Sequence, residues 1–255
     1  AELFADLQHA YNEIQEVDTL KSNFLSTISH ELRTPLTSIL GFVQLILEGR
    51  ADGPINETQR RLLMRVVDKS RDLHSMVNDI LEIAEIQAEG LVRLDPEPVA
   101  VEEIVGQVID RVAQRRRTAE VEIEHRLPAQ PLPLVMGDFQ AVERVFYHII
   151  DNALKFIPVR GKVAVSYRSL PGHVEVSVQD TGIGMAPEHL GKIFDHFYQI
   201  ENDLSRAYNG VGLGLTITKK LLTLLDAPIH VESELGKGTT MTVSFKVADV
   251  EEPAP

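Results

Sequence analysis

The sequence predicts a protein of two parts, an all-α antiparallel helical hairpin followed by an α+β two-layer sandwich. Apolar residues recur every three, four or seven positions through residues 1–89, which is the spacing of helices that pack against one another. After a proline-rich stretch at residues 94–98, short runs of alternating apolar residues lie between helical segments. This second pattern is typical of strands in a mixed layer fold.

Residues 1–49 are expected to form one long helix with an apolar stripe of coiled-coil spacing. The stripe consists of Leu3, Leu7, Ala10, Ile14, Val17, Phe24, Ile28, Leu32, Leu36, Ile39, Val43 and Ile46. Pro35 interrupts the helix, because proline removes a backbone hydrogen bond and clashes with the carbonyl group of Glu31, at a cost of about 3 kcal/mol. We therefore expect a hinge in the helix beside His30.

A second helix is expected from about residue 56 to residue 89, after the helix-breaking residues 49–54 and before Gly90. Its apolar stripe consists of Leu62, Val66, Leu73, Val77, Ile80 and Ala84. Two such helices in one hairpin leave apolar surface uncovered, and pairing two hairpins into a dimeric four-helix bundle covers it. The sequence therefore predicts a homodimer formed through residues 20–90.

The second part is expected to pack its helices on one face of a sheet. Helices are expected at residues 101–112, 139–156 and 213–225, and strands at residues 121–125, 163–167, 174–178 and 241–247. The two middle strands form a hairpin that turns near Pro171 and Gly172.

The composition excludes several classes of function. A net charge of −13 disfavours binding to DNA or RNA, which requires a basic surface. The absence of cysteine excludes disulfides, thiolate chemistry and Cys-ligated zinc, and the nine histidines lack metal-binding spacing. No apolar run approaches the roughly 20 residues that span a bilayer, and no secretory signal is visible, so we expect no membrane contact within this sequence.

Three clusters of glycine lie within residues 180–239. In the first, Asp180 ends a predicted strand, where its carboxylate is placed to accept a hydrogen bond from an amino group. In the second, residues 210–215 open a helix, and amide groups at a helix N-terminus bind phosphate. The third, residues 236–239, fails the P-loop pattern because glycine follows the lysine. Each cluster alone is compatible with a simple turn, but three together favour a ligand.

The predicted helix at residues 139–156 presents His148, Asp151, Asn152 and Lys155 on one face. The Asn carbonyl group can ligate a hard cation, and the Lys ammonium group can meet a phosphate. A solvated helix face explains this segment equally well when it is considered by itself.

Taken in order, these segments resemble the sensor histidine kinases of two-component signalling, from about residue 20 to residue 247. Residues 24–36 resemble the family's H-box, with His30 as the phosphoacceptor. The resemblance implies a second domain with the ATP-binding sandwich shared by gyrase and Hsp90. It assigns ATP to Asn152, Lys155, Asp180, Gly182, Gly184, Tyr198, Arg206, Gly210, Gly212, Gly214, Leu215 and Thr239, and Mg²⁺ to Asn152 and His148.

The resemblance also implies roles around the phosphoacceptor. His30 attacks the γ-phosphoryl group, and Glu31 takes or stabilises the proton of the other ring nitrogen. Thr34, one helical turn later, positions the water that dephosphorylates the response regulator. Two residues depart from the family pattern: His148 stands where a second asparagine is usual, and Gln199 stands where many relatives have arginine, so Arg206 is expected to replace that contact.

We therefore expect an ATP-dependent protein histidine kinase that phosphorylates His30, transfers the group to an aspartate of a response regulator receiver domain, and also acts as its phosphatase. One alternative is a nucleotide-binding regulatory scaffold with little kinase activity. Another is a gyrase-like or Hsp90-like ATPase, but these enzymes have a glutamate where His148 stands and lack an H-box. A cytoplasmic location is expected, with the upstream sensor outside this chain.

The expected domains follow from these boundaries. They are a connector helix at residues 1–20, a dimerisation and phosphotransfer hairpin at 21–93, a linker at 94–100, the catalytic ATP-binding domain at 101–248 and a tail at 249–255.

Overall fold

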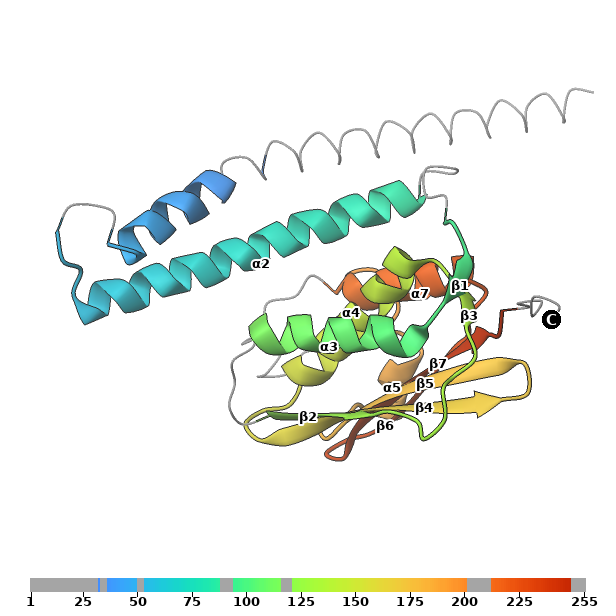
Figure 1. Cartoon of the computed structure of the whole chain (residues 1–255). Coiled ribbons are helices and arrows are strands. Elements are labelled where there is room, and N and C mark those ends of the chain that lie inside the picture. Colours follow the sequence, from blue (N-terminus) through green and yellow to red (C-terminus); the bar gives the residue numbers. More distant parts are fainter. Residues whose placement is uncertain are drawn as a thin grey trace, which may run out of the picture. The chain divides into compact units, whose positions relative to one another are not determined.

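The computed structural model describes Leu32 and residues 36–49, 53–87, 94–115, 121–200 and 212–248. The chain divides into two compact units, residues 1–92 and residues 93–255 (Figure 1). The expected connector helix and the hinge at Pro35 lie outside the described residues. None of the helices that the structure describes combines the length and the apolar character needed to cross a bilayer.

The first unit contains the second predicted helix and, within the described residues, the last part of the first one. Residues 36–47 are helical, and α2 spans Glu57–Gln87. The start of α2 is fixed by a capping box, in which the side chains of Asn56 and Gln59 each accept a hydrogen bond from the other residue's amide group, at 2.8 and 2.9 Å. Among the described residues of this unit, the buried apolar side chains are Leu36, Val43, Val67, Val77 and Ile83.

The second unit is built on a mixed five-stranded sheet with the strand order β2-β4-β5-β7-β6. The strands are β2 (Val121–Arg126), β4 (Gly161–Leu170), β5 (His173–Asp180), β6 (Ile229–Glu234) and β7 (Gly238–Lys246). β2 pairs with β4 in parallel, and the other neighbours are antiparallel. The predicted hairpin of β4 and β5 is confirmed.

Three helices cover one face of this sheet: α3 (Val101–Arg115), α4 (Phe139–Lys155) and α7 (Gly214–Leu224) (Figure 1). The core lies between the layers, where alternate residues of β5 and β7 meet the apolar stripe of α4. Its central side chains, each almost fully buried, are Phe146, Ile149, Ile150, Val174, Val176, Val243 and Phe245. A short helix, α5 (Pro187–Leu190), follows β5. The predicted α+β two-layer sandwich is confirmed.

A separate two-stranded sheet joins β1 (Glu97–Val99) to β3 (Val135–Gly137). Residues 94–100, which the sequence predicts to be a linker, therefore include a strand that pairs within the second unit. Asp138 anchors this region, because one carboxylate oxygen caps α4 through the amide of Ala141 and the other accepts from the amide of Asp95, at 2.9 and 3.0 Å.

Candidate functional site

Five of the predicted site residues lie outside the described part of the chain. They are His30, Glu31, Thr34, Arg206 and Gly210. The other predicted residues all belong to the second unit. They lie at the end of β5 and in the loop after it, on β7, on α4, at the start of α7 and in the segments between α5 and α7.

Three neighbouring strands carry a polar residue where their buried stripes end. On β5 the inward-facing valines lead to Asp180, and on β7 the stripe of Phe245, Val243 and Met241 leads to Thr239. β6 runs beside β7, and its Ser233 pairs directly with Thr239. Because side chains alternate along a strand, all three polar side chains face the helix layer at the same end of the sheet.

Asp180 is a buried carboxylate, with 8% of the residue exposed. Its Oδ1 atom accepts hydrogen bonds from the amide groups of Gly182 at 2.7 Å and Thr239 at 3.3 Å. Burial raises the pKa of Asp180, and these two bonds oppose that shift only in part. With Oδ1 held by the backbone, the carboxylate has a fixed orientation at the end of β5.

The loop after Asp180 packs against the β6–β7 hairpin backbone to backbone. Gly184 has a φ of +60°, and a side-chain carbon on it would lie 2.0 Å from the carbonyl oxygen of Glu234. A side-chain carbon on Gly238 would lie equally close to the carbonyl oxygen of Asp180. The amide of Gly236 also donates to the carbonyl oxygen of Ile183 at 2.7 Å. Side chains at these glycines would push the two loops apart.

The hydroxyl group of Ser233 joins the same two loops. It accepts from the amide of Met185 at 2.8 Å, donates to the carbonyl oxygen of Gly238 at 3.0 Å and lies 2.9 Å from the hydroxyl oxygen of Thr239. Neither Ser233 nor the strand that carries it was predicted from the sequence. The only signal was the alternation of Ile229, Val231 and Ser233, which is short and ends in a polar residue.

His148 of α4 lies against the start of α7. A side-chain carbon on Gly214 would lie 2.9 Å from its Nδ1 atom, so only glycine allows this approach. Burial lowers the pKa of His148 to about 4. The positive charge of Arg144 also lowers this pKa, whereas the carboxylate of Asp151 raises it. The imidazole is therefore neutral at physiological pH.

Asn152 and Lys155 follow on the same helix. The Asn152 side chain is partly exposed, and its amide oxygen suits a hard cation such as Mg²⁺. The Lys155 ammonium group lies 5.5 Å from the centre of the Phe156 ring. Within the described ranges, no three His, Asp or Glu side chains gather closely enough to hold a metal.

The N-terminus of α7 lacks the side-chain hydrogen bond that an N-cap residue commonly supplies. Its N-cap residue is Leu213, which makes no side-chain cap hydrogen bond. The amides of Gly214 and Leu215 therefore belong to an open helix N-terminus, which attracts anions. Gly212, with a φ of +73°, precedes this turn, and a side-chain carbon on it would lie 2.6 Å from the carbonyl oxygen of Tyr198.

Tyr198 is held at both its backbone and its side chain. Its hydroxyl group lies 2.7 Å from Nδ1 of His189 on α5. The preceding residue, Phe197, has a φ of +61°, a conformation that costs a non-glycine residue about 1–2 kcal/mol. Thr216 of α7 donates to the carbonyl oxygen of Asp195 at 3.2 Å and ties this segment to α7. The structure thus brings Tyr198 and Gly212 together.

Comparisons with known proteins agree with this geometry. Residues 137–249 match the family model described as histidine kinase-, DNA gyrase B- and HSP90-like ATPase. Residues 20–89 match the model of the His kinase A (phospho-acceptor) domain, so His30 falls within that domain.

Individual relatives extend over nearly the whole chain. The Non-motile and phage-resistance protein of Caulobacter vibrioides is 33% identical over 96% of this chain and 30% of its own length. The Circadian input-output histidine kinase CikA of Synechococcus elongatus is 31% identical over 94% of this chain and 32% of its own length. The chain thus spans about a third of these curated relatives.

Among solved structures, full-length ShkA in complex with AMPPNP matches 89% of this chain and 46% of its own chain. The TM-score is 0.69, and the sequences are 31% identical. The mycobacterial sensor histidine kinase MprB matches 60% of this chain and 98% of its own, with a TM-score of 0.52 and 26% identity.

Proposed function

The chain belongs to the histidine kinases and carries their catalytic core, and from this premise we propose that it uses ATP to phosphorylate His30 and passes the phosphoryl group to an aspartate of a response regulator. One observation carries the proposal. A fixed buried carboxylate, Asp180, and an open helix N-terminus, that of α7, occur in one domain that follows a phosphoacceptor domain.

The bound nucleotide would lie between these two features. The Asp180 carboxylate accepts a hydrogen bond from the adenine amino group, and Thr239 lies next to it on β7. The amides at the start of α7 and the Lys155 ammonium group face the phosphates. Asn152, assisted by His148, would hold Mg²⁺, which would neutralise charge on the phosphates.

In the transfer step, the neutral imidazole of His30 attacks the γ-phosphorus atom. A nitrogen–phosphorus bond forms, the bond between this phosphorus and the β,γ-bridging oxygen breaks, and ADP leaves. Glu31 accepts the proton from the other ring nitrogen. In the proposed phosphatase reaction, Thr34 positions the water that attacks the aspartyl phosphate of the response regulator.

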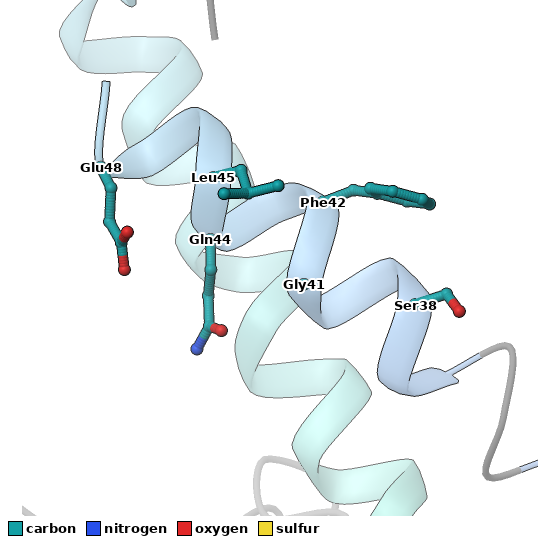
Figure 2. A pocket seen from close by; sticks show the side chains of 6 residues that line it. All are labelled: Ser38, Gly41, Phe42, Gln44, Leu45 and Glu48. Carbon is teal, nitrogen blue, oxygen red and sulfur yellow. The ribbon is translucent and has the colours of Figure 1, made fainter. Parts of the chain in front are cut away.

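The fold of the first unit supports a homodimer. Each helix has apolar residues that its partner helix in the same chain does not cover: Ile39, Phe42 and Leu45 on the first helix, and Leu62, Val66 and Leu73 on α2, all between 41% and 66% exposed. Figure 2 shows Phe42 and Leu45 extending from the same side of the first helix, beside Gly41 and Ser38. Pairing two hairpins would bury this surface.

We expect the chain to sediment as a dimer at micromolar concentration in analytical ultracentrifugation. Phe42→Glu places a charge in the proposed interface and should shift the protein to monomer, whereas Glu48→Gln at the edge of the same surface should leave the dimer intact. A wild-type protein that sediments only as monomer at this concentration would contradict the dimer.

The burial of His148 predicts a pH dependence of stability. Because its pKa is about 4 when folded and near 6.5 when unfolded, the unfolded chain binds its proton more tightly. Stability is therefore complete above pH 6.5 and falls as the pH drops towards 4, by about 3 kcal/mol from this residue. His148→Asn should remove that part of the loss in urea unfolding between pH 7 and 4.5. If the free energy of unfolding falls equally with pH in the wild type and in His148→Asn, this prediction is wrong.

The regulatory scaffold remains the second candidate, because His148 is a neutral residue packed against Gly214 where relatives usually place a metal-binding asparagine. Calorimetry with ATP and Mg²⁺, followed by labelling with γ-labelled ATP, separates the two. A kinase binds ATP and gains a label that is stable in base and labile in acid. Binding of ATP with no phosphohistidine would favour the scaffold.

We also propose a cytoplasmic location and an upstream sensor region, because kinase activity requires a supply of ATP and the two relatives named above are about three times as long as this chain. The expected domain limits, with a phosphotransfer hairpin at residues 21–93 and a catalytic domain at 101–248, form part of the same proposal.

A further inference from the structure

The hydroxyl group of Ser233 contacts three hydrogen-bonding groups but has only one proton to donate. Its oxygen lies within hydrogen-bond distance of the amide of Met185, the carbonyl oxygen of Gly238 and the hydroxyl oxygen of Thr239. The amide can only donate and the carbonyl oxygen can only accept. Ser233 therefore accepts from Met185 and gives its one proton to Gly238.

This assignment fixes the proton of Thr239. Since Ser233 has no second proton, the 2.9 Å contact between the two hydroxyl groups requires Thr239 to donate and Ser233 to accept. The Thr239 oxygen can then offer only lone pairs to a ligand. The Thr239 amide is likewise committed, because it donates to Oδ1 of Asp180 at 3.3 Å.

The side chains of Asp180 and Thr239 therefore form an array that can only accept hydrogen bonds from a ligand. Asp180 presents a carboxylate, and Thr239 presents an oxygen whose proton points towards Ser233. Where it faces position 6 of a purine, such an array favours an amino group there and disfavours a carbonyl group.

We propose that Ser233 is a specificity-determining positioning residue, which holds the Thr239 hydroxyl group as an acceptor and so makes the site select a 6-amino purine over a 6-oxo purine. This inference rests on the proposed nucleotide site. Ser233 itself acts through Thr239 and through the loop that it joins to the β6–β7 hairpin.

Replacing Ser233 with alanine tests the proposal. Without the serine oxygen, the Thr239 hydroxyl group is free to rotate and donate to a 6-oxo group. The full chain is titrated with ATP and with inosine triphosphate, both with Mg²⁺, and the ratio of the two dissociation constants is compared. We expect Ser233→Ala to lower the ratio of the dissociation constant for inosine triphosphate to that for ATP about tenfold, which is the effect of one hydrogen bond.

The chain offers a matched control. Ser177 and Thr242 form another cross-strand hydroxyl pair, also at 2.9 Å, on the opposite face of the same sheet. Ser177→Ala should leave the ratio unchanged. Ser233→Thr keeps the hydroxyl group and should retain the wild-type ratio. If Ser233→Ala does not fold, Ser233→Cys, whose thiol is a weak donor and acceptor, replaces it with the same expectation.

An unchanged ratio in the Ser233 variant overturns the inference, whether both affinities stay the same or both fall equally, because a merely structural role affects the two nucleotides alike. Failure of the wild-type chain to bind either nucleotide overturns the proposed function itself. The two failures are therefore distinguishable.

Discussion

Asp180→Asn is expected to weaken ATP binding at least about 100-fold and to abolish autophosphorylation. The asparagine oxygen can still accept the amides of Gly182 and Thr239, so the loop keeps its support. The new amide group, however, directs N–H donors at the adenine amino group where a carboxylate oxygen stood. Loss of a hydrogen bond to a charged group costs about 1.5–3 kcal/mol, and the opposed donors add to this loss. Calorimetric titration with ATP measures the effect.

The same variant should keep its stability or gain some. Burial raises the pKa of Asp180 in the folded protein, so the folded state loses stability as the pH rises through that pKa. The ionised carboxylate thus destabilises the folded state at neutral pH, and asparagine removes this charge. Thermal unfolding of both proteins at pH 7 checks this. A large drop in melting temperature together with the loss of binding would show that Asp180 serves the fold rather than the ligand.

Gly184→Ala is expected to destabilise the second unit by about 2–5 kcal/mol and to prevent ATP binding. The left-handed backbone costs alanine about 1–2 kcal/mol, and the contact of 2.0 Å with the carbonyl oxygen of Glu234 forces the two loops apart. Separation of these loops also breaks the contacts of Ser233 with Met185. Urea unfolding of the full chain and titration with ATP measure the two effects.

Gly172→Ala is the matched control for backbone strain. Gly172, at the turn between β4 and β5, also has a positive φ, +75°, but a side-chain carbon there would meet nothing within 4 Å. We expect this variant to lose only the 1–2 kcal/mol of backbone strain and to bind ATP normally. If Gly172→Ala and Gly184→Ala lose equal free energy of unfolding, the close contact between the two loops at Gly184 contributes nothing to stability.

Elements with a strong local signal were predictable from the sequence. The second helix of the hairpin was expected from about residue 56, and its capping residues Asn56 and Gln59 place its start at Glu57. The alternating valines of β4 and β5 likewise predicted a hairpin, since period-two burial is visible in sequence.

Elements that depend on pairing partners were not predictable. β1 and β3 have three residues each, and β1 contains Pro98, so neither shows a strand pattern of its own. β6 owes its place to pairing with β7 and has few apolar residues. Ser233 was missed for this reason, because its role arises from three contacts with residues of other segments or strands.

The candidate site was predicted in part. Asp180, Thr239 and the start of α7 were recognised from motifs, and the structure brings Asp180 and Thr239 together through a hydrogen bond. The packing of His148 against Gly214 was not visible, because the sequence shows only that a histidine replaces an asparagine. The pKa of His148 follows from that packing and thus required the structure.

We propose above all that ATP bound by the nucleotide domain phosphorylates His30. The most direct test incubates the wild-type chain and His30→Gln with γ-labelled ATP and Mg²⁺, and measures the label that is labile in acid and stable in base. The account predicts strong labelling of the wild type and none of His30→Gln, while both proteins bind ATP with equal affinity. Acid-labile label that persists in His30→Gln would contradict it.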